Sequence, residues 1–399
     1  MDLVRLPPNA LRPGQRLAFS LRDASGKLLF ASGSVLPASE AVRELLARGA
    51  YTQAYETENY RREMTERANA LVHQNASLGE IARVRPDFST ERARPVAEAG
   101  DAAQWQELQL RTHQLLREPQ AEHFLSRFEA LRQEALERLQ RHPDQTLMLA
   151  VHDASQEIQH YTARHALLCM VLAQLAAERL EWPHAEQESL TRAALSMNLA
   201  LGLLQDRLTH QREGLNADQQ RQLADHGDRA ADLLMRMGVH DANWLQAVRL
   251  HHDAAPGPLG GRAVGERLAR LLMRVDQFAA RLSPRVARKA QAGAQASRAI
   301  FLDELRQQDE AGAALIKAVG LYPPGSFVRL ASGEEGMVVR RGSGATEPLV
   351  AALIGKSGNP LTEPVPRDTR LASQAVTHSL APHELRLRVA IDKLARLAA

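Results

Sequence analysis

Apolar and polar residues alternate near the start of the chain in the pattern of β-strands. Leu17, Phe19 and Leu21 alternate with polar neighbours, a turn-forming sequence follows at 23–26, and a second apolar run begins directly after it. A side-chain period of two on both sides of such a turn predicts a β-hairpin. With a short helix and one further strand behind it, the hairpin predicts a small β-rich N-terminal domain over residues 1–57.

The next segment, residues 58–144, changes from irregular to helical. Its first half is polar and has little periodicity, which is typical of a linker. From Trp105 the period becomes helical, and the segment is expected to end in connector helices. One apolar stripe lies on the last of these, at Phe124, Phe128, Leu131, Ala135 and Leu139. The stripe predicts an intramolecular packing face, with the seam of a homodimer as the alternative.

Helical periodicity is almost unbroken over residues 145–319 and stops at the Gly- and Pro-rich sequence that begins at Gly320. The expected helices are 147–181, 186–208, 216–237, 241–252, 262–282 and 286–319. Short apolar runs separated by turn residues follow, and they predict strands at 327–330, 337–340 and 349–354. A last helix is expected from Pro382. Residues 320–399 are therefore predicted to form a β-strand appendage with a terminal helix, and the whole chain is predicted to be mainly α.

Composition and charge exclude several classes of function. Hydrophobic residues make up 44% of the 399 residues and aromatic residues 4%, which favours helices with aliphatic seams. The net charge is only +3 and no Lys/Arg-rich run occurs, so nothing indicates nucleic-acid binding. Cys169 has no second cysteine to pair with, which is typical of a reducing cytoplasm. The sequence lacks both an 18-residue apolar run and an apolar signal segment, so we expect a cytoplasmic protein without a membrane span.

Histidines are the candidate metal ligands of the helical block. His165, His226, the adjacent pair His251 and His252, and Asp276 lie on successive predicted helices. Imidazole and carboxylate groups from successive helices commonly build a metal site in the core of an all-α bundle. The alternative is that these are core histidines satisfied by hydrogen bonds. We found no phosphate-binding loop, no Gly-x-Ser-x-Gly elbow and no His-Glu-x-x-His sequence.

Several sequence segments resemble the HD-GYP domain, a branch of the HD phosphohydrolase superfamily. The run GLYPPGSFVRLASGEEGMVV at 320–339 is similar to the segment that closes that domain. HGDRAADLL from His226, VRLHH ending at His252 and VDQFA around Asp276 resemble its histidine and aspartate elements. The resemblance covers about residues 145–375. It implies an HD-type helical bundle, metal-dependent hydrolysis of cyclic di-GMP and an Fe- or Mn-type centre held by the five residues above.

The chain departs from that family at the positions that name it. Met197 and Asn198 stand where the family has its His-Asp pair, so no catalytic residues are expected there. Leu201 replaces a lysine that helps to hold the substrate phosphate, and Tyr161 replaces a glutamate of the trinuclear members. The loop that carries the Gly-Tyr-Pro signature is reduced to DAAPGPLGG at 253–261. The resemblance therefore implies a degenerate member.

The expected function is cyclic di-GMP-related signalling, in which a catalytically degenerate HD-GYP-like domain binds a protein or a nucleotide. The alternative is a metal-dependent cyclic di-GMP phosphodiesterase with an altered metal centre. We expect either no cofactor or a single Fe- or Mn-type ion, because a two-metal centre needs a carboxylate between the cations. The expected partners are a protein of a signalling pathway and cyclic di-GMP, with neither nucleic acid nor a membrane.

Overall fold

The structure is a computed structural model in which the chain forms two compact units, Met1–Glu98 and Ala99–Ala399. Of the first unit it describes residues 3–6, 11, 17, 21–23, 28–30, 36, 42 and 49–53. Of the second it describes residues 101–399 except 118, 120–122, 157, 386 and 388 and except the side chain of Leu203.

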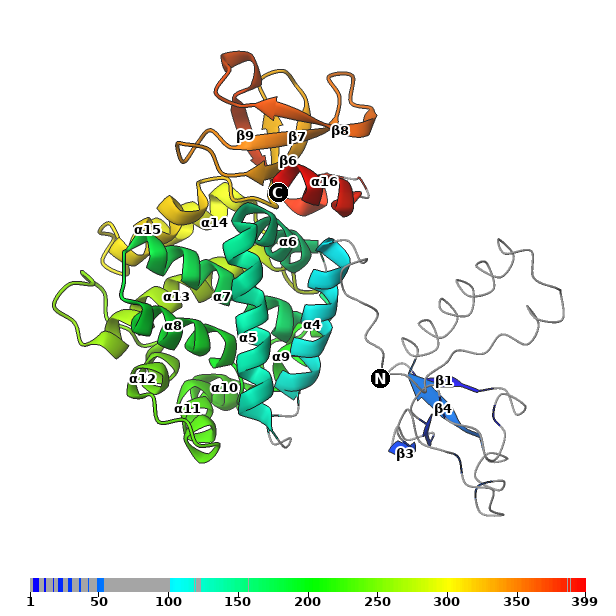
Figure 1. Cartoon of the computed structure of the whole chain (residues 1–399), viewed down its shortest axis with the longest axis vertical. Coiled ribbons are helices and arrows are strands. Elements are labelled where there is room, and N and C mark those ends of the chain that lie inside the picture. Colours follow the sequence, from blue (N-terminus) through cyan, green and yellow to red (C-terminus); the bar gives the residue numbers. More distant parts are fainter. Residues whose placement is uncertain are drawn as a thin grey trace. The chain divides into compact units, whose positions relative to one another are not determined.

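The described part of the first unit is a small antiparallel sheet (Figure 1). Its strands are β1 (Leu3–Arg5), β2 (Leu21–Arg22), β3 (Leu28–Phe30) and β4 (Tyr51–Gln53), in the order β1-β4-β2-β3. The pairing of β2 with β3 confirms the predicted hairpin. Leu17 and Leu21 are fully buried with Leu36 in the core of this unit. Most of the predicted short helix, and the expected linker up to residue 100, lie outside the described residues.

Thirteen helices of the second unit lie in the described part of the chain, which confirms the mainly α class. They are α4 (Asp101–Arg117), α5 (Phe124–Arg141), α6 (Pro143–Gln156), α7 (Tyr161–Arg179), α8 (His184–Ser196), α9 (Leu203–His210), α10 (Ala217–Ala224), α11 (His226–Arg236), α12 (Ala242–Leu250), α13 (Val264–Leu282), α14 (Gly293–Phe301), α15 (Glu310–Val319) and α16 (Ile391–Ala398). The start of α4 at Asp101 corrects the expected linker, which was to run to about residue 104.

The apolar stripe of α5 faces the core of the second unit. All five of its residues are buried, and they belong to the same hydrophobic cluster as the neighbouring helices. Phe128 stacks on Trp244 of α12 with ring centroids 5.6 Å apart. The prediction of an intramolecular packing face is confirmed, because the stripe is covered by this chain's own helices.

Four of the six long helices that periodicity predicts are in fact pairs of shorter helices. The expected helix 147–181 is α6 and α7, and the chain turns between them at His160, which has φ 53°. The expected helix 186–208 is α8 and α9. These two are separated by a turn that ends at Gly202, with φ 45° and ψ −126°, a conformation open to glycine and costly for other residues.

The other two predicted helices are also divided. The expected helix 216–237 changes direction at Asp225, between α10 and α11; Asn216 caps α10 through a capping box with Gln219. The expected helix 286–319 is α14 and α15, and Asp309 caps the second by accepting a hydrogen bond from the Gly312 amide. Apolar spacing alone did not show these breaks, because it continues across them.

The C-terminal appendage is a five-stranded antiparallel sheet in the order β8-β7-β6-β5-β9. Its strands are β5 (Phe327–Leu330), β6 (Glu335–Arg340), β7 (Leu349–Ile354), β8 (Pro360–Asp368) and β9 (Val376–Leu380). The first three were predicted and the last two were not. The predicted helix from Pro382 begins only at Ile391, after a single 3₁₀ turn at 382–384. Figure 1 shows α16 between this sheet and α6.

One hydrophobic core extends through the second unit from Ala102 to Ala398. This core joins α4 and α5 to the helices that follow. The domain boundaries predicted after residues 144 and 319 stay predictions. No helix among the described residues has the length and apolar character needed to cross a membrane.

Candidate metal centre

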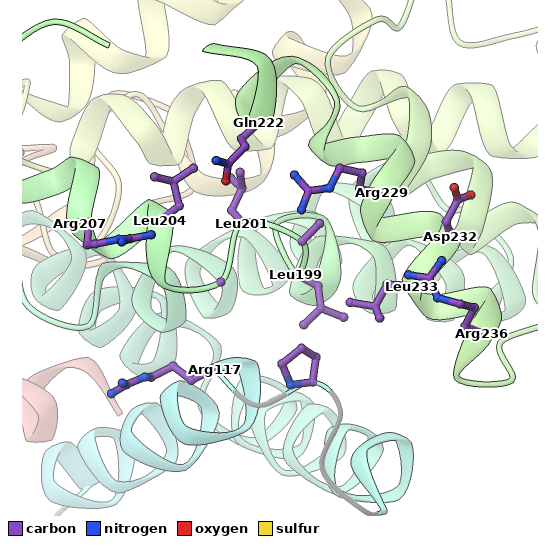
Figure 2. A pocket seen from close by; sticks show the side chains of 13 residues that line it. Arg117, Leu199, Leu201, Leu204, Arg207, Gln222, Arg229, Asp232, Leu233 and Arg236 are labelled. Atoms are coloured by element: carbon purple, nitrogen blue, oxygen red, sulfur yellow. The ribbon is translucent and has the colours of Figure 1, made fainter. Parts of the chain in front are cut away.

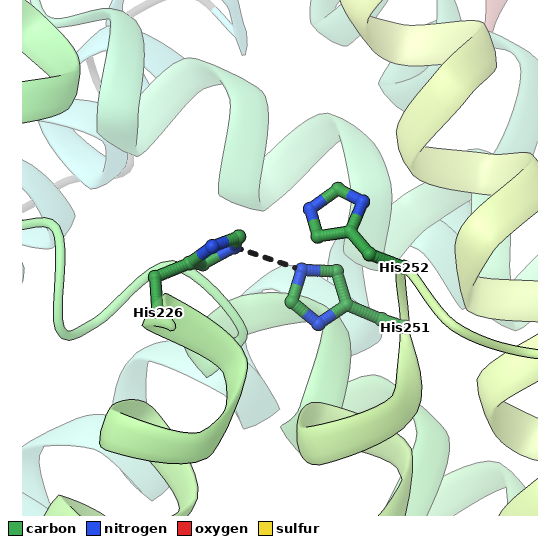
Figure 3. Close-up of side chains that lie close together, drawn as sticks. All are labelled: His226, His251 and His252. Carbon is green, nitrogen blue, oxygen red and sulfur yellow. Dashed lines mark hydrogen bonds between the residues drawn. The ribbon is translucent and has the colours of Figure 1, made fainter. Parts of the chain in front are cut away.

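Three of the predicted ligands meet where α11 begins and α12 ends. His226 is the first residue of α11, His251 is the C-cap of α12, and His252 follows it. A Cβ atom on Gly227 would lie 2.9 Å from the carbonyl oxygen of Arg249 and 3.1 Å from that of Val248. Only glycine allows this close approach of the two helix ends. The position of Gly227 therefore brings the three imidazole rings together, as Figure 3 shows.

The hydrogen bonds of the first two rings determine which of their nitrogens carries the proton. His226 Nδ1 lies 2.6 Å from the carbonyl oxygen of Leu223, and His251 Nδ1 lies 2.6 Å from that of Val248. A carbonyl oxygen only accepts, so we assign the proton to Nδ1 in both rings. The two Nε2 atoms face each other at 3.1 Å (Figure 3). In the neutral rings both carry lone pairs, and only a proton or a metal cation between them makes this contact favourable.

Burial disfavours the proton. Desolvation, together with the charge of His252, lowers the pKa of His251 to about 3. Desolvation likewise lowers the pKa of His226, although its bond to the Leu223 carbonyl opposes the shift. Both rings are therefore neutral near pH 7, with two unprotonated nitrogens pointing at one place. His252 completes the group, because one ligand atom from each of the three histidines lies within 4.8 Å of the others. Imidazole nitrogens in this arrangement suit a transition-metal ion.

The other two predicted ligands form a second group with Cys169. His165 Nε2 lies 2.8 Å from Asp276 Oδ1, and the Cys169 sulfur lies 3.5 Å from the same nitrogen. His165 and Cys169 are one turn apart on α7, and Asp276 projects from α13. Nδ1 of His165 is buried, and no described residue offers it a hydrogen bond. This group supplies an imidazole, a carboxylate and a thiol.

Charge in the second group is concentrated on Asp276. Burial would raise the pKa of this carboxyl, but the hydrogen bond and charge of His165, with the charges of His251 and His252, hold it well below its usual range. Desolvation, followed by the charge of Asp276, raises the pKa of the buried Cys169 thiol well above its usual value. Cys169 is therefore protonated, and it is a buried free cysteine of α7.

The structure brings all five predicted ligands into one region but divides them into two groups. The charge of Asp276 acts on the pKa of both His226 and His251, so the groups are neighbours. Met197, at the family's histidine position, is 1% exposed and belongs to the main hydrophobic core. Asn198 is 9% exposed.

Sequence reasoning missed a basic group beside Asp276. The Tyr161 ring stacks on His165 with ring centroids 5.3 Å apart, and the Arg285 guanidinium lies over the Tyr161 ring, 5.4 Å from its centroid. Burial lowers the pKa of both Arg281 and Arg288. The charge of Arg274 lowers the pKa of Arg281 further and that of Asp276 opposes the shift, while the charges of Arg285 and Arg281 lower the pKa of Arg288 further. The sequence does contain an indication of this basic group, because four cationic residues lie within 281–289, shortly after Asp276.

Comparisons with known proteins add one structural similarity. No protein-family model matches the sequence, and no curated protein matches it. The structure is similar to that of Bd1817, a HDG"Y"P protein from Bdellovibrio bacteriovorus, with 14% sequence identity over 79% of this chain and 98% of that chain. The TM-score is 0.38, which is too low to carry an argument about fold or function.

Proposed function

We propose that this chain is a cyclic di-GMP-related signalling protein whose degenerate HD-GYP-like domain binds one metal ion and a phosphodiester ligand without hydrolysing it. It acts by binding that nucleotide or a protein partner in the cytoplasm. The observation that carries the proposal is the pair of unprotonated Nε2 atoms of His226 and His251, held 3.1 Å apart by bonds from their Nδ1 atoms. Lone pairs placed in this way repel each other unless a cation lies between them.

One ion fits the available charge better than two. Asp276 is the only carboxylate in the two ligand groups, the lowered pKa values of His226 and His251 keep these two rings neutral near pH 7, and Cys169 stays protonated. Two divalent ions about 4 Å apart would repel by about 16 kcal/mol at an effective dielectric constant of about 20. In the HD-GYP family an aspartate between the two ions would offset this repulsion, but this chain has the uncharged Asn198 at that position. The family's neighbouring histidine position is occupied by the buried Met197.

A phosphodiester ligand suits the basic group of Arg281, Arg285 and Arg288 beside the second ligand group. The Arg285 guanidinium donates from Nη2 to the Tyr161 hydroxyl at 3.3 Å, and the Tyr161 ring in turn stacks on His165. Guanidinium groups bind phosphate oxygens with two parallel hydrogen bonds. A bound ion would supply a further positive charge for the ligand, and the arginines would orient it.

The test is metal analysis and turnover of the purified full chain. We expect one Fe, Mn or Zn ion per chain and no cleavage of cyclic di-GMP. In the double variant Met197→His with Asn198→Asp, we expect a second ion and measurable cleavage. Two ions per wild-type chain, or wild-type turnover that Asp276→Ala abolishes, would contradict the proposal.

The alternative function is a metal-dependent cyclic di-GMP phosphodiesterase with an altered centre. It is favoured by the second ligand group, in which His165, Cys169 and Asp276 offer three donor atoms within 4.8 Å. If a metal ion displaced the thiol proton, Cys169 would add the missing negative charge. The variant Cys169→Ala separates the two functions, because it would reduce the number of bound ions only if this group holds one.

A further inference from the structure

An open basic pocket of about 480 Å³ lies where the end of α4, the turn before α9 and helix α11 meet (Figure 2). It shares no lining residue with the two ligand groups. Four arginines supply its cationic lining, and they are Arg117, Arg207, Arg229 and Arg236. The chain has a net charge of only +3, so the four arginines make this pocket a local concentration of positive charge.

Within the part of the chain that the structure describes, the positive charge of the pocket is not neutralised. Asp232 is the one carboxylate among the described residues that line it, and it accepts a hydrogen bond from Arg249, outside the pocket, at 2.8 Å. Among the described residues, no carboxylate forms an ion pair with any of the four arginines. Like charges around one space repel, and a bound anion would remove that repulsion.

The pocket combines this charge with an apolar floor. Figure 2 shows Arg207 and Arg229 extending from α9 and α11 toward the space around Leu201. Leu201 and Leu204 are 6% and 5% exposed, and they form a small hydrophobic cluster beneath it. Low-dielectric walls strengthen the field of nearby charges, and the volume falls in the range of pockets that hold small organic ligands. Phosphate oxygens fit the arginines, and the organic part of a ligand fits the leucines.

We propose that this pocket binds a small organic molecule that carries a phosphate or pyrophosphate group, at a site that shares no lining residue with the histidine groups. Its phosphate oxygens accept hydrogen bonds from Arg207 and Arg229, and its organic part covers the leucine floor. Because no metal ligand lines the pocket, binding does not require an ion. The site therefore stands even if the proposed single-ion centre does not.

The test is calorimetric titration of the full chain after chelation of metals and dialysis. ADP and pyrophosphate are the two ligands, because they share the diphosphate group and differ in the organic part. We expect ADP to bind more tightly than pyrophosphate and both to weaken as salt is added. Arg229→Gln and Arg207→Gln each remove one charge-assisted contact and should weaken ADP binding about tenfold.

Arg298→Gln is the matched control, because Arg298 is exposed on α14 and does not line the pocket. It should bind ADP as the wild type does. All three variants replace exposed arginines, and their thermal unfolding shows whether the fold is retained. The proposal is overturned if neither ligand binds, if the pocket variants bind like Arg298→Gln, or if ADP binds no more tightly than pyrophosphate.

Discussion

Gly227 controls both the packing of α11 against α12 and the geometry of the three histidines. In Gly227→Ala the new methyl group would lie 2.9 Å and 3.1 Å from two backbone oxygens of α12. Ordinary contacts of this kind are about 3.4 Å or longer, and a helix backbone moves away only as a unit. The two helix ends must separate, which also separates His226 Nε2 from His251 Nε2.

The expected cost follows from two opposing effects. Overpacking a well-packed contact costs about 1–3 kcal/mol, and replacing a helical glycine by alanine returns up to about 1 kcal/mol of helix propensity. We therefore expect Gly227→Ala to lower the free energy of unfolding by about 1–2 kcal/mol. Ion affinity should fall by at least tenfold, because ligand nitrogens displaced by a few tenths of an ångström no longer share one coordination centre.

Urea unfolding and a calorimetric titration with Mn²⁺ or Zn²⁺ measure the two effects. Gly214→Ala is the matched control, because no atom lies within 4 Å of the added methyl group and its φ is not positive. Its stability should change by less than about 0.5 kcal/mol. If Gly227→Ala bound the ion like Gly214→Ala, the reasoning that the close helix approach builds the histidine group would be wrong.

Two further predictions concern His251, and a third concerns the carboxylate that caps α15. His251→Ala should abolish ion binding, whereas the exposed His240→Ala should leave it unchanged, as metal analysis of the two variants would show. In metal-free protein the pKa of His251 is about 3 in the folded state and 6.5 in the unfolded state. Because the unfolded chain then binds a proton more readily, this difference leaves the stability unaffected above pH 6.5 and lowers it as the pH falls from 6.5 toward 3. Urea unfolding between pH 7 and pH 4 should then show a shallower loss in His251→Gln, and an unchanged slope would refute the assignment. Asp309→Ala should lower the free energy of unfolding by about 3–5 kcal/mol, because the buried guanidiniums of Arg270 and Arg274 lose a shared buried carboxylate and α15 loses its cap. Glu304→Ala is the control in the same urea assay. It should cost less than about 1 kcal/mol, because the Glu304 side chain is 46% exposed.

The predicted and observed folds differ where spacing carries no information. Strand β8 was not predicted because it lies at the sheet edge, its residues are mostly exposed, and it contains Pro360, Pro364 and Pro366. Prolines are tolerated there because an edge strand has amides without a ladder partner. The break at His160 was equally hidden, since a single left-handed residue leaves the apolar period intact.

Side-chain patterns in the sequence predicted the mainly α class, the N-terminal hairpin, three strands of the appendage and the five candidate ligands. These follow from side-chain period and residue chemistry, which are local properties. Only the tertiary structure decided how the ligands divide, because His226 meets His251 through a contact that Gly227 permits between two helix ends. It also decided the proton positions and the basic pocket, since both depend on carbonyls and arginines that distant segments bring together.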